Sequence, residues 1–325
     1  MKEFGGYLPL ELYPGEEYYK KNEKMDVLSF SSGKAAIYYA LKESKVKAVH
    51  IPYYICGSVE KIAEYAGVEV KRYFIDIEFV PKNIEADDGE MVILVNYFGI
   101  LHDKIKKIYR NYSCVMIDNT QAFFEEPILE KDVYNVYSCK KFIGVPDGGY
   151  LIGKKVNKEC YQKLEQDYSS QNMEFCLTNL EYGTALGYQN KKENDKRFLK
   201  QIRRMSDATR KILGSTNYGF VKERRIDNFK EIHRRLKGFN LLRLDDREFV
   251  PYYYPFLWKR DIRKELVEKK VYVPTLWQEL IEDKFEGTVE KEFSEKLSFL
   301  PLDQRYSRDD MAEICGRVME CIESK

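Results

Sequence analysis

The sequence predicts an α/β protein with a large three-layer domain, built on a mostly parallel sheet, and a small C-terminal α+β domain. Short apolar runs alternate with helix-like stretches between residues 35 and 118, a pattern typical of βαβ units. Charged, mainly helical sequence follows over residues 157–236. Short aromatic runs and a last helix then replace it, so we expect the domains at 1–238 and 239–325.

The first half supplies the alternating elements of the large domain. Helices are expected at 35–42, 58–66 and 102–109, and strands at 48–52, 70–75, 92–96 and 115–118. Ser32 and Gly33 open the first helix and Gly67 closes the second, as capping preferences predict. In open α/β sheets ligands gather at the C-terminal ends of the strands, so residues that follow these strands are the candidates for a site.

The second half continues with an apolar strand at 133–137 and the sequence Ser138-Cys139-Lys140-Lys141. A Pro-Asp-Gly-Gly turn leads from there into a second apolar run. In the C-terminal part we expect a helix at 261–269 and a last helix from Ser307.

Composition excludes several function classes. The 325 residues have a net charge of +1, so no field attracts nucleic acid or an anionic membrane. No apolar run approaches the roughly 20 residues of a membrane span, and the N-terminus lacks a signal-peptide core. Seven cysteines without a C-x-x-C pair and only three histidines predict a cytoplasmic protein without disulfides or a metal.

Two candidate segments lie near the start of the chain. Ser31-Ser32-Gly33-Lys34 precedes the first helix, whose free amides attract anions, phosphate above all. A simple N-cap with a flexible glycine is the alternative. Tyr54 follows the strand at 48–52, where its ring could stack on a planar ligand or fill a corner of the core.

Two further segments follow later strands. Asp118, with Gln121 three residues on, ends an apolar strand; its carboxylate could pair with a cationic ring nitrogen or form an Asx turn. Lys140 and Lys141 follow Ser138, and adjacent strand residues point to opposite faces, so only one lysine can face a given site. A desolvated lysine has a pKa near about 7–8 and becomes a usable nucleophile and base. Two exposed loop lysines are the alternative.

Together, and in this order, the four segments fit pyridoxal 5′-phosphate (PLP): a phosphate at a helix start, a ring beside an aromatic, a carboxylate on the ring nitrogen and a lysine on the aldehyde. The chain resembles the DegT/StrS sugar aminotransferases, which are PLP-dependent transferases of fold type I. The resemblance covers about residues 30 to 310 and lies in SFSSGKAAIYYAL, HIPYYICGSVEKIAEYAGVEVKRYFID, VNYFG, VMIDNTQAF and YSCKKFIGVPDGG, with YYYPFLW, VYVPTLW and LSFLPLDQRYS in the tail.

The resemblance implies roles for single residues around the phosphate. The amides of Gly33 and Lys34, next to Ser32, hold it together with the Ser138 hydroxyl. Lys34 stands where the family has a threonine. Cys56 stands where the family has its ring-stacking aromatic, which leaves the stacking to Tyr54 or to no residue.

The resemblance also implies roles around the ring. Asp118 pairs with the pyridine nitrogen, Gln121 lies near the ring face or its 3-hydroxyl, and Lys141 carries the cofactor as a Schiff base. The family's lysine commonly lies five residues after the serine, whereas Lys141 lies three after Ser138, so Lys140 stays the second candidate.

The implied function is transfer of an amino group from a donor such as glutamate to a keto sugar, nucleotide-linked, in polysaccharide or glycoconjugate biosynthesis. The implied assembly is a homodimer that acts on small molecules. A PLP-dependent sugar dehydratase, other PLP chemistry and a non-catalytic scaffold are the alternatives. Arg305 is a further candidate for binding a substrate carboxylate. Arg224, Arg225 and Asn228 resemble a family segment that lies near the active site, but they are interpreted as a solvated helix face.

Overall fold

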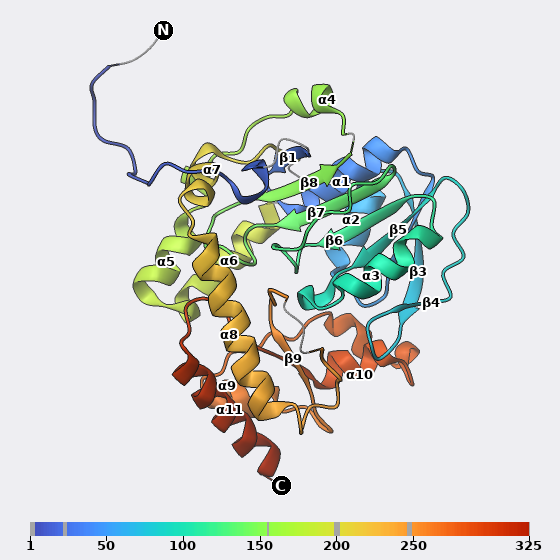
Figure 1. Cartoon of the computed structure of the whole chain (residues 1–325), viewed down its shortest axis with the longest axis vertical. Coiled ribbons are helices and arrows are strands. Elements are labelled where there is room, and N and C mark those ends of the chain that lie inside the picture. Colours follow the sequence, from blue (N-terminus) through green and yellow to red (C-terminus); the bar gives the residue numbers. More distant parts are fainter. Residues whose placement is uncertain (1–3, 22–24, 155, 198–201, 246–248, 325) are drawn as a thin grey trace.

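The described residues fold around an eight-stranded sheet (Figure 1). The computed structural model describes residues 4–21, 25–154, 156–197, 202–245 and 249–324. The strands cross the sheet in the order β1-β8-β7-β6-β5-β2-β3-β4. Their bounds are β1 Asp26–Phe30, β2 Ala48–Pro52, β3 Glu69–Ile75, β4 Pro81–Lys82, β5 Glu90–Val95, β6 Val115–Asn119, β7 Val133–Ser138 and β8 Gly149–Gly153.

The central strands are parallel, as predicted. β3, β2, β5, β6 and β7 pair in that order, with Val95 opposite Asp118 and Asn119 opposite Tyr137. β2, β5 and β6 are buried along their whole length, as parallel strands covered on both faces should be. The sequence prediction lacks β1, which pairs antiparallel with β8, and β8 in turn runs antiparallel to β7.

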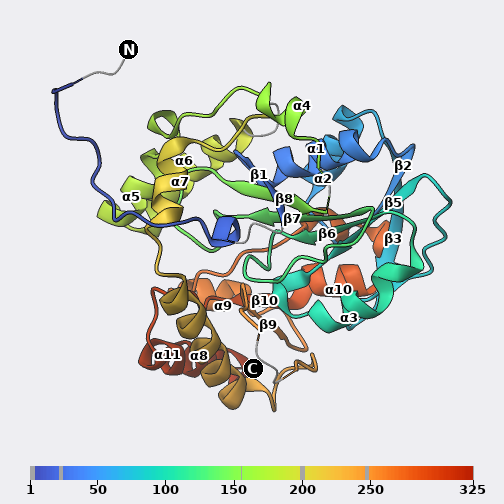
Figure 2. The same cartoon turned by 45° about the horizontal axis from the view of Figure 1, so that its top comes forward.

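Helices cover both faces of the sheet and make the three predicted layers. In Figure 1, α1 (Gly33–Ser44) and α2 (Gly57–Tyr65) lie behind the sheet and α3 (His102–Ile108) lies in front of it; Figure 2 shows the same arrangement. The bounds of all three helices agree with the prediction to within two residues. The reason is local, since their caps and apolar positions are written in short stretches of sequence.

The predicted helical region follows the sheet. Its helices are α4 Lys158–Gln162, α5 Glu174–Tyr182, α6 Thr184–Arg197, α7 Asp207–Gly214 and α8 Tyr218–Leu236. α5 and α6 pack against each other as a hairpin, and α8 runs from the edge of the sheet toward the C-terminal part of the chain (Figure 1).

The C-terminal part has its own small sheet and its own hydrophobic cluster. Strands β9 (Tyr254–Leu257) and β10 (Leu297–Leu300) are antiparallel. The remaining helices are α9 Arg263–Glu268, α10 Val289–Lys296 and α11 Arg308–Glu323. A cluster of buried side chains joins β9, α9 and α11 to Phe229, Ile232 and Leu236 of α8. The division of the chain at 238/239 stays a prediction.

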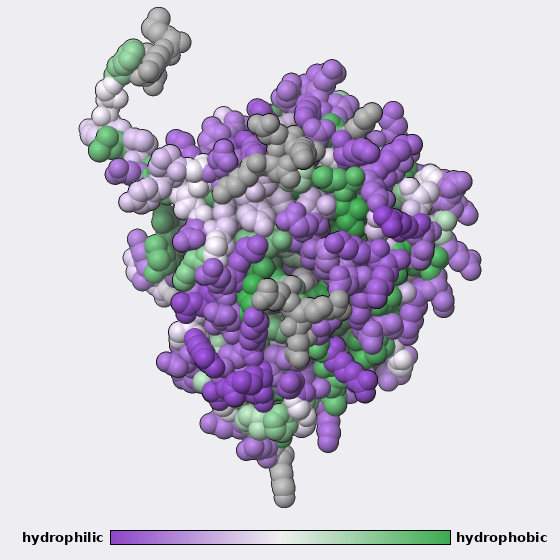
Figure 3. Space-filling view, in the orientation of Figure 1, coloured by the Kyte–Doolittle hydropathy of each residue, from purple (hydrophilic) through white to green (hydrophobic). Residues whose placement is uncertain are grey.

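The surface is mostly hydrophilic on the face that Figure 3 shows, with hydrophobic residues gathered around a hollow near its centre. A cavity of about 640 Å³ lies between α3, α8 and the segments 242–245 and 249–250. Among the described residues, no helix combines the length and the apolar character needed to cross a bilayer.

Candidate active site

The start of helix α1 lies against the turn that enters β8. Ser32 caps the helix, and its hydroxyl accepts a hydrogen bond of 3.2 Å from the amide of Ala35. A Cβ at Gly149 would lie 2.5 Å from the carbonyl carbon of Ser32 and 2.6 Å from the amide nitrogen of Gly33. Only glycine allows this approach, which explains the second glycine of the Pro-Asp-Gly-Gly turn.

Two other strand ends meet the same helix start. A Cβ at Gly33 would lie 3.1 Å from Cγ2 of Thr120 and 3.6 Å from Cβ of Ser138. The start of α1 therefore lies against Thr120, which follows β6, and against Ser138, which ends β7. The amide end of this twelve-residue helix lies next to Ser138 and next to Gly149, which has no side chain to fill the space. Free helix amides and a serine hydroxyl are the donors that an oxyanion such as phosphate requires.

Thr120 joins the lysine of this site to its carboxylate. Nζ of Lys141 donates a hydrogen bond of 3.1 Å to Oγ1 of Thr120. The backbone amide of Thr120 donates one of 2.9 Å to Oδ1 of Asp118, which is 4% exposed. Amine and carboxylate thus contact one short segment at the end of β6. Thr120 is absent from the residues that the sequence predicts for the site, although its position two residues after Asp118 was the available signal.

The electrostatics of Lys141 follow from this position. Burial of the amine lowers the pKa of Lys141, because the charged form loses water. The positive charges of Lys191 and Lys34 lower it further, whereas Asp118 and Cys56 act in the opposite direction. An amine with a lowered pKa is unprotonated more often at neutral pH and is then a nucleophile.

The side chain of Lys140 points toward helices α5 and α6. Its Nζ donates a hydrogen bond of 2.9 Å to Oδ1 of Asn194 on α6 and lies 5.3 Å from the ring centroid of Phe175 on α5. The two adjacent lysines therefore diverge, although both lie in the turn that follows β7 and not in the strand itself. Lys141 is the one that lies with Thr120 and Asp118.

The side chains of Gln121 and Tyr54 contact other parts of the protein. Oε1 of Gln121 accepts a hydrogen bond of 3.2 Å from the amide of Phe98, which has a left-handed φ of 56°. The ring of Tyr54 is 0% exposed and meets Trp277 edge-on at 4.2 Å between centroids. Tyr54 thus fills the core, the alternative that the sequence left open; its stacking on a ligand and the ring contact of Gln121 stay predictions.

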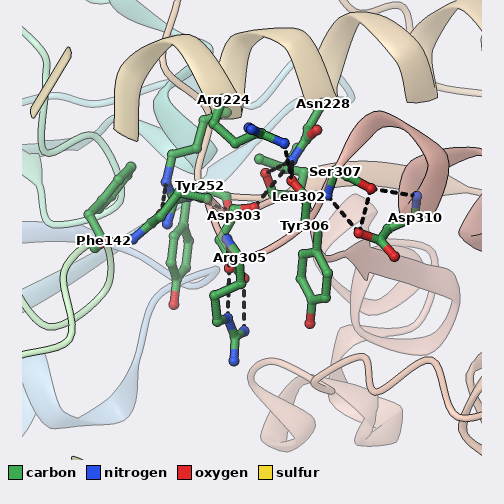
Figure 4. A network of polar contacts seen from close by, with 12 residues as sticks. Phe142, Arg224, Asn228, Tyr252, Leu302, Asp303, Arg305, Tyr306, Ser307 and Asp310 are labelled. Atoms are coloured by element: carbon green, nitrogen blue, oxygen red, sulfur yellow. Dashed lines mark hydrogen bonds and ion pairs between the residues drawn. The ribbon is translucent and has the colours of Figure 1, made fainter. Parts of the chain in front are cut away.

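A polar network from the C-terminal part reaches the lysine segment (Figure 4). Figure 4 draws Phe142 and Tyr252 beneath helix α8, and their ring centroids are 5.4 Å apart. The ring centroid of Tyr252 lies 5.9 Å from Nζ of Lys141. Tyr252 is likewise absent from the predicted site, because no spacing in the chain connects it with the lysine.

The arginines of this network differ from their sequence interpretation. Arg225 and Asn228 are 2% and 1% exposed, so a solvated helix face is wrong for both. Arg305 forms a two-point ion pair with Asp303, with N–O distances of 2.7 and 2.9 Å. A substrate carboxylate would therefore compete with Asp303 for this guanidinium.

Solved structures share the fold of this chain. DesV from S. venezuelae, in complex with a ketimine intermediate, has a TM-score of 0.63 and 14% identity and covers 92% of this chain and 85% of its own. A DegT DnrJ EryC1 StrS aminotransferase from Brucella abortus has a TM-score of 0.61 and 12% sequence identity, and the match covers 92% of this chain and 86% of the aminotransferase. NtdA from Bacillus subtilis, with bound cofactor PMP, has a TM-score of 0.61 and 16% sequence identity, and the match covers 92% of this chain and 73% of NtdA.

No protein-family model matches the sequence, and a search of curated proteins finds no match. The comparison therefore rests on structural similarity alone. At sequence identities this low, structural similarity establishes the fold. The fold is that of PLP-dependent aminotransferases, so the predicted fold class is confirmed for the large, mostly parallel sheet and its helices; the separate small C-terminal domain stays a prediction.

Proposed function

We propose that the chain is a PLP-dependent aminotransferase. One observation carries the proposal: Lys141, Asp118 and the amide end of α1 converge around Thr120. A reactive amine, a buried carboxylate and an oxyanion cradle are the three fixed requirements of this cofactor.

The residues present fit PLP. The amides of Gly33 and Lys34 and the hydroxyl of Ser138 would hold the phosphate, in the cradle that Gly149 keeps clear. Asp118 would lie at the pyridine nitrogen, where a buried carboxylate finds the cationic partner that it needs. When bound, the cofactor supplies an electron sink for the carbon that loses a proton.

The chain supplies the proton transfer. Lys141, with its lowered pKa, presents a free amine as nucleophile and, once released, holds the migrating proton at Nζ. The hydroxyl of Thr120 accepts a hydrogen bond from that amine and so orients it. Lys140 is directed toward α6, which supports Lys141 as the lysine that binds the cofactor.

For the substrate we propose an amino acid donor such as glutamate and a keto sugar, nucleotide-linked, as the acceptor. The solved structures that share the fold include one described as an aminotransferase involved in the biosynthesis of pseudoaminic acid, which supports a sugar acceptor. We propose polysaccharide or glycoconjugate biosynthesis in the cytoplasm as the setting. We also propose a homodimer, supported by the exposed apolar side chains of the α5–α6 hairpin, among them Leu180 at 82% and Tyr182 at 70% exposure.

The test is cofactor capture. Purified full-length protein is mixed with PLP, reduced with borohydride and digested, and the labelled lysine is identified by mass spectrometry. We expect visible absorbance before reduction and a label on Lys141. Lys141→Ala should abolish both, and Lys140→Ala should abolish neither. Label on neither lysine would refute the proposed function and favour the scaffold alternative.

A further inference from the structure

A buried arginine connects the C-terminal part of the chain to the lysine segment. Arg225, on α8, is 2% exposed. Its Nε donates a hydrogen bond of 3.0 Å to Oε1 of Gln304, and one Nη donates to the carbonyls of Pro251 and Tyr252 at 3.1 and 3.3 Å. The charge is therefore satisfied by three acceptors from two segments that lie far from α8 in the sequence.

The same arginine and its glutamine partner hold the residue that follows Lys141. The guanidinium carbon of Arg225 lies 4.5 Å from the ring centroid of Phe142. Nε2 of Gln304 donates a hydrogen bond of 2.8 Å to the carbonyl of Phe142. Phe142 is thus fixed by its ring and by its main chain, and both contacts depend on the pair of Arg225 and Gln304.

The second group that Arg225 fixes lies across from the amine. Tyr252, whose carbonyl accepts from Arg225, has its ring centroid 5.9 Å from Nζ of Lys141. The rings of Tyr252 and Phe142 also contact each other. One side chain therefore sets both the backbone next to the lysine and an aromatic wall beside its amine.

We propose that Arg225, acting with Gln304, is a positioning residue that holds the amine of Lys141 in its enclosed place beside Tyr252. The proposal deepens the proposed function and rests on it, because it assigns importance to the position of Lys141. Arg225 itself need not touch a ligand.

The physical reason lies in the cost of burying a charge. A buried guanidinium is tolerated only while its acceptors are in place, because each lost partner leaves a desolvated charge. Burial lowers the pKa of Arg225 to about 10, so the side chain stays charged at neutral pH. Because the buried charge needs its acceptors, Arg225 holds Gln304 and Tyr252 in place, and Gln304 in turn holds Phe142.

A merely structural role predicts something different. If Arg225 only anchored the C-terminal part to α8, its loss would lower the stability of the protein and leave the environment of Lys141 unchanged. If it positions Lys141, its loss admits water to the amine, and the pKa of Lys141 rises toward its ordinary value.

The experiment measures Lys141 directly, in full-length protein from which PLP has been removed. The protein is acylated with a trace of acetic anhydride at a series of pH values, and fragment ions report Lys141 relative to Lys140. The variants are Arg225→Met, Arg225→Lys and Gln304→Glu. Gln304→Glu retains an acceptor for Arg225 but removes the donor to Phe142. The matched control is Arg224→Met, because Arg224 precedes Arg225 on α8 and also donates to a carbonyl, that of Tyr306.

We expect Arg225→Met to move the pH profile of the Lys141-to-Lys140 ratio upward by about one unit, which lowers the ratio about tenfold at pH values below the pKa of Lys141. Arg225→Lys and Gln304→Glu should give intermediate values, and Arg224→Met should match wild type. An unchanged ratio in folded Arg225→Met protein would overturn the proposal. If that variant does not fold, an unchanged ratio in Gln304→Glu overturns it instead. Failure of wild-type protein to bind PLP would refute the proposed function separately, because the ratio is measured without cofactor.

Discussion

The amine of Lys141 lies 3.1 Å from the hydroxyl oxygen of Thr120. Because the amide of Thr120 also binds Asp118, this one residue sets the place of the proposed nucleophile relative to the proposed ring partner.

Thr120→Val should weaken PLP binding about tenfold, since loss of one hydrogen-bond partner costs about 1–1.5 kcal/mol. Absorbance titration with PLP measures the change. Thr120→Ser retains the hydroxyl and should bind nearly as tightly as wild type. Equal affinity in Thr120→Val would show that the hydrogen bond does not orient the amine.

Gly149→Ala should disrupt the cradle, because the added methyl would lie 2.5 Å from the carbonyl carbon of Ser32. Overpacking of this kind costs about 1–3 kcal/mol or more, and here the backbone of the phosphate site must move. We expect lower stability in urea unfolding and weaker PLP binding. Gly144→Ala, in the same connection but with no atom within 4 Å of the new methyl, is the control and should change neither.

Asp118→Asn should leave PLP binding within about tenfold of wild type while slowing the half-reaction with an amino donor by about 10²–10³-fold. The amide can still accept from Thr120, but it has no negative charge to offer a ring nitrogen. Stopped-flow spectra after addition of glutamate measure the rate. Asp76→Asn is the control, because Asp76 follows β3 and accepts hydrogen bonds from the amides of Glu78 and Val80 in its own turn. A normal rate in Asp118→Asn would remove this carboxylate from the mechanism.

Lys34→Met should raise the pKa of Lys141, because the charge of Lys34 disfavours the protonated amine. The pH at which Lys141 becomes reactive should therefore move upward. Acylation rates of Lys141 across pH, measured without cofactor, report the shift. Lys42→Met removes a charge from the other end of α1 and should leave the profile in place. A profile that moves downward would contradict the assigned electrostatics.

Glu90 should stabilise the fold in a pH-dependent way. Hydrogen bonds from Lys71 and His50 lower the pKa of Glu90 from 4.5 to about 2. A depressed carboxyl pKa stabilises the protein above its ordinary value, and this contribution is lost as the pH falls through the folded-state value. Glu90→Gln should therefore be less stable than wild type at pH 7, and the difference should narrow between about pH 4.5 and 2. Urea unfolding at several pH values measures it, with the exposed Glu69→Gln as control. A constant difference would contradict the prediction.

Much of the fold could be predicted because its signals are local. The apolar run before Asp118 forms β6 as expected, and Ser32 caps α1 because its hydroxyl reaches an amide three residues away. Strand β1 was missed because its five residues, DVLSF, form a short run without regular alternation of polar and apolar residues. The antiparallel direction of β8 depends on a turn and two neighbouring strands, which no single stretch specifies.

The sequence by itself determined which chemical groups lie at the start of the first helix and near the strand ends: Ser32 and Gly33, Asp118, Ser138 and the two lysines. Only the tertiary structure decided their directions. It turned Lys141 toward Thr120 and Lys140 toward α6, filled the core with Tyr54, and buried Arg225 against Phe142. The physical reason is the distance along the sequence over which each signal acts. Strand periods and caps act over a few residues, whereas the burial and partners of a side chain depend on segments that fold in from elsewhere in the chain.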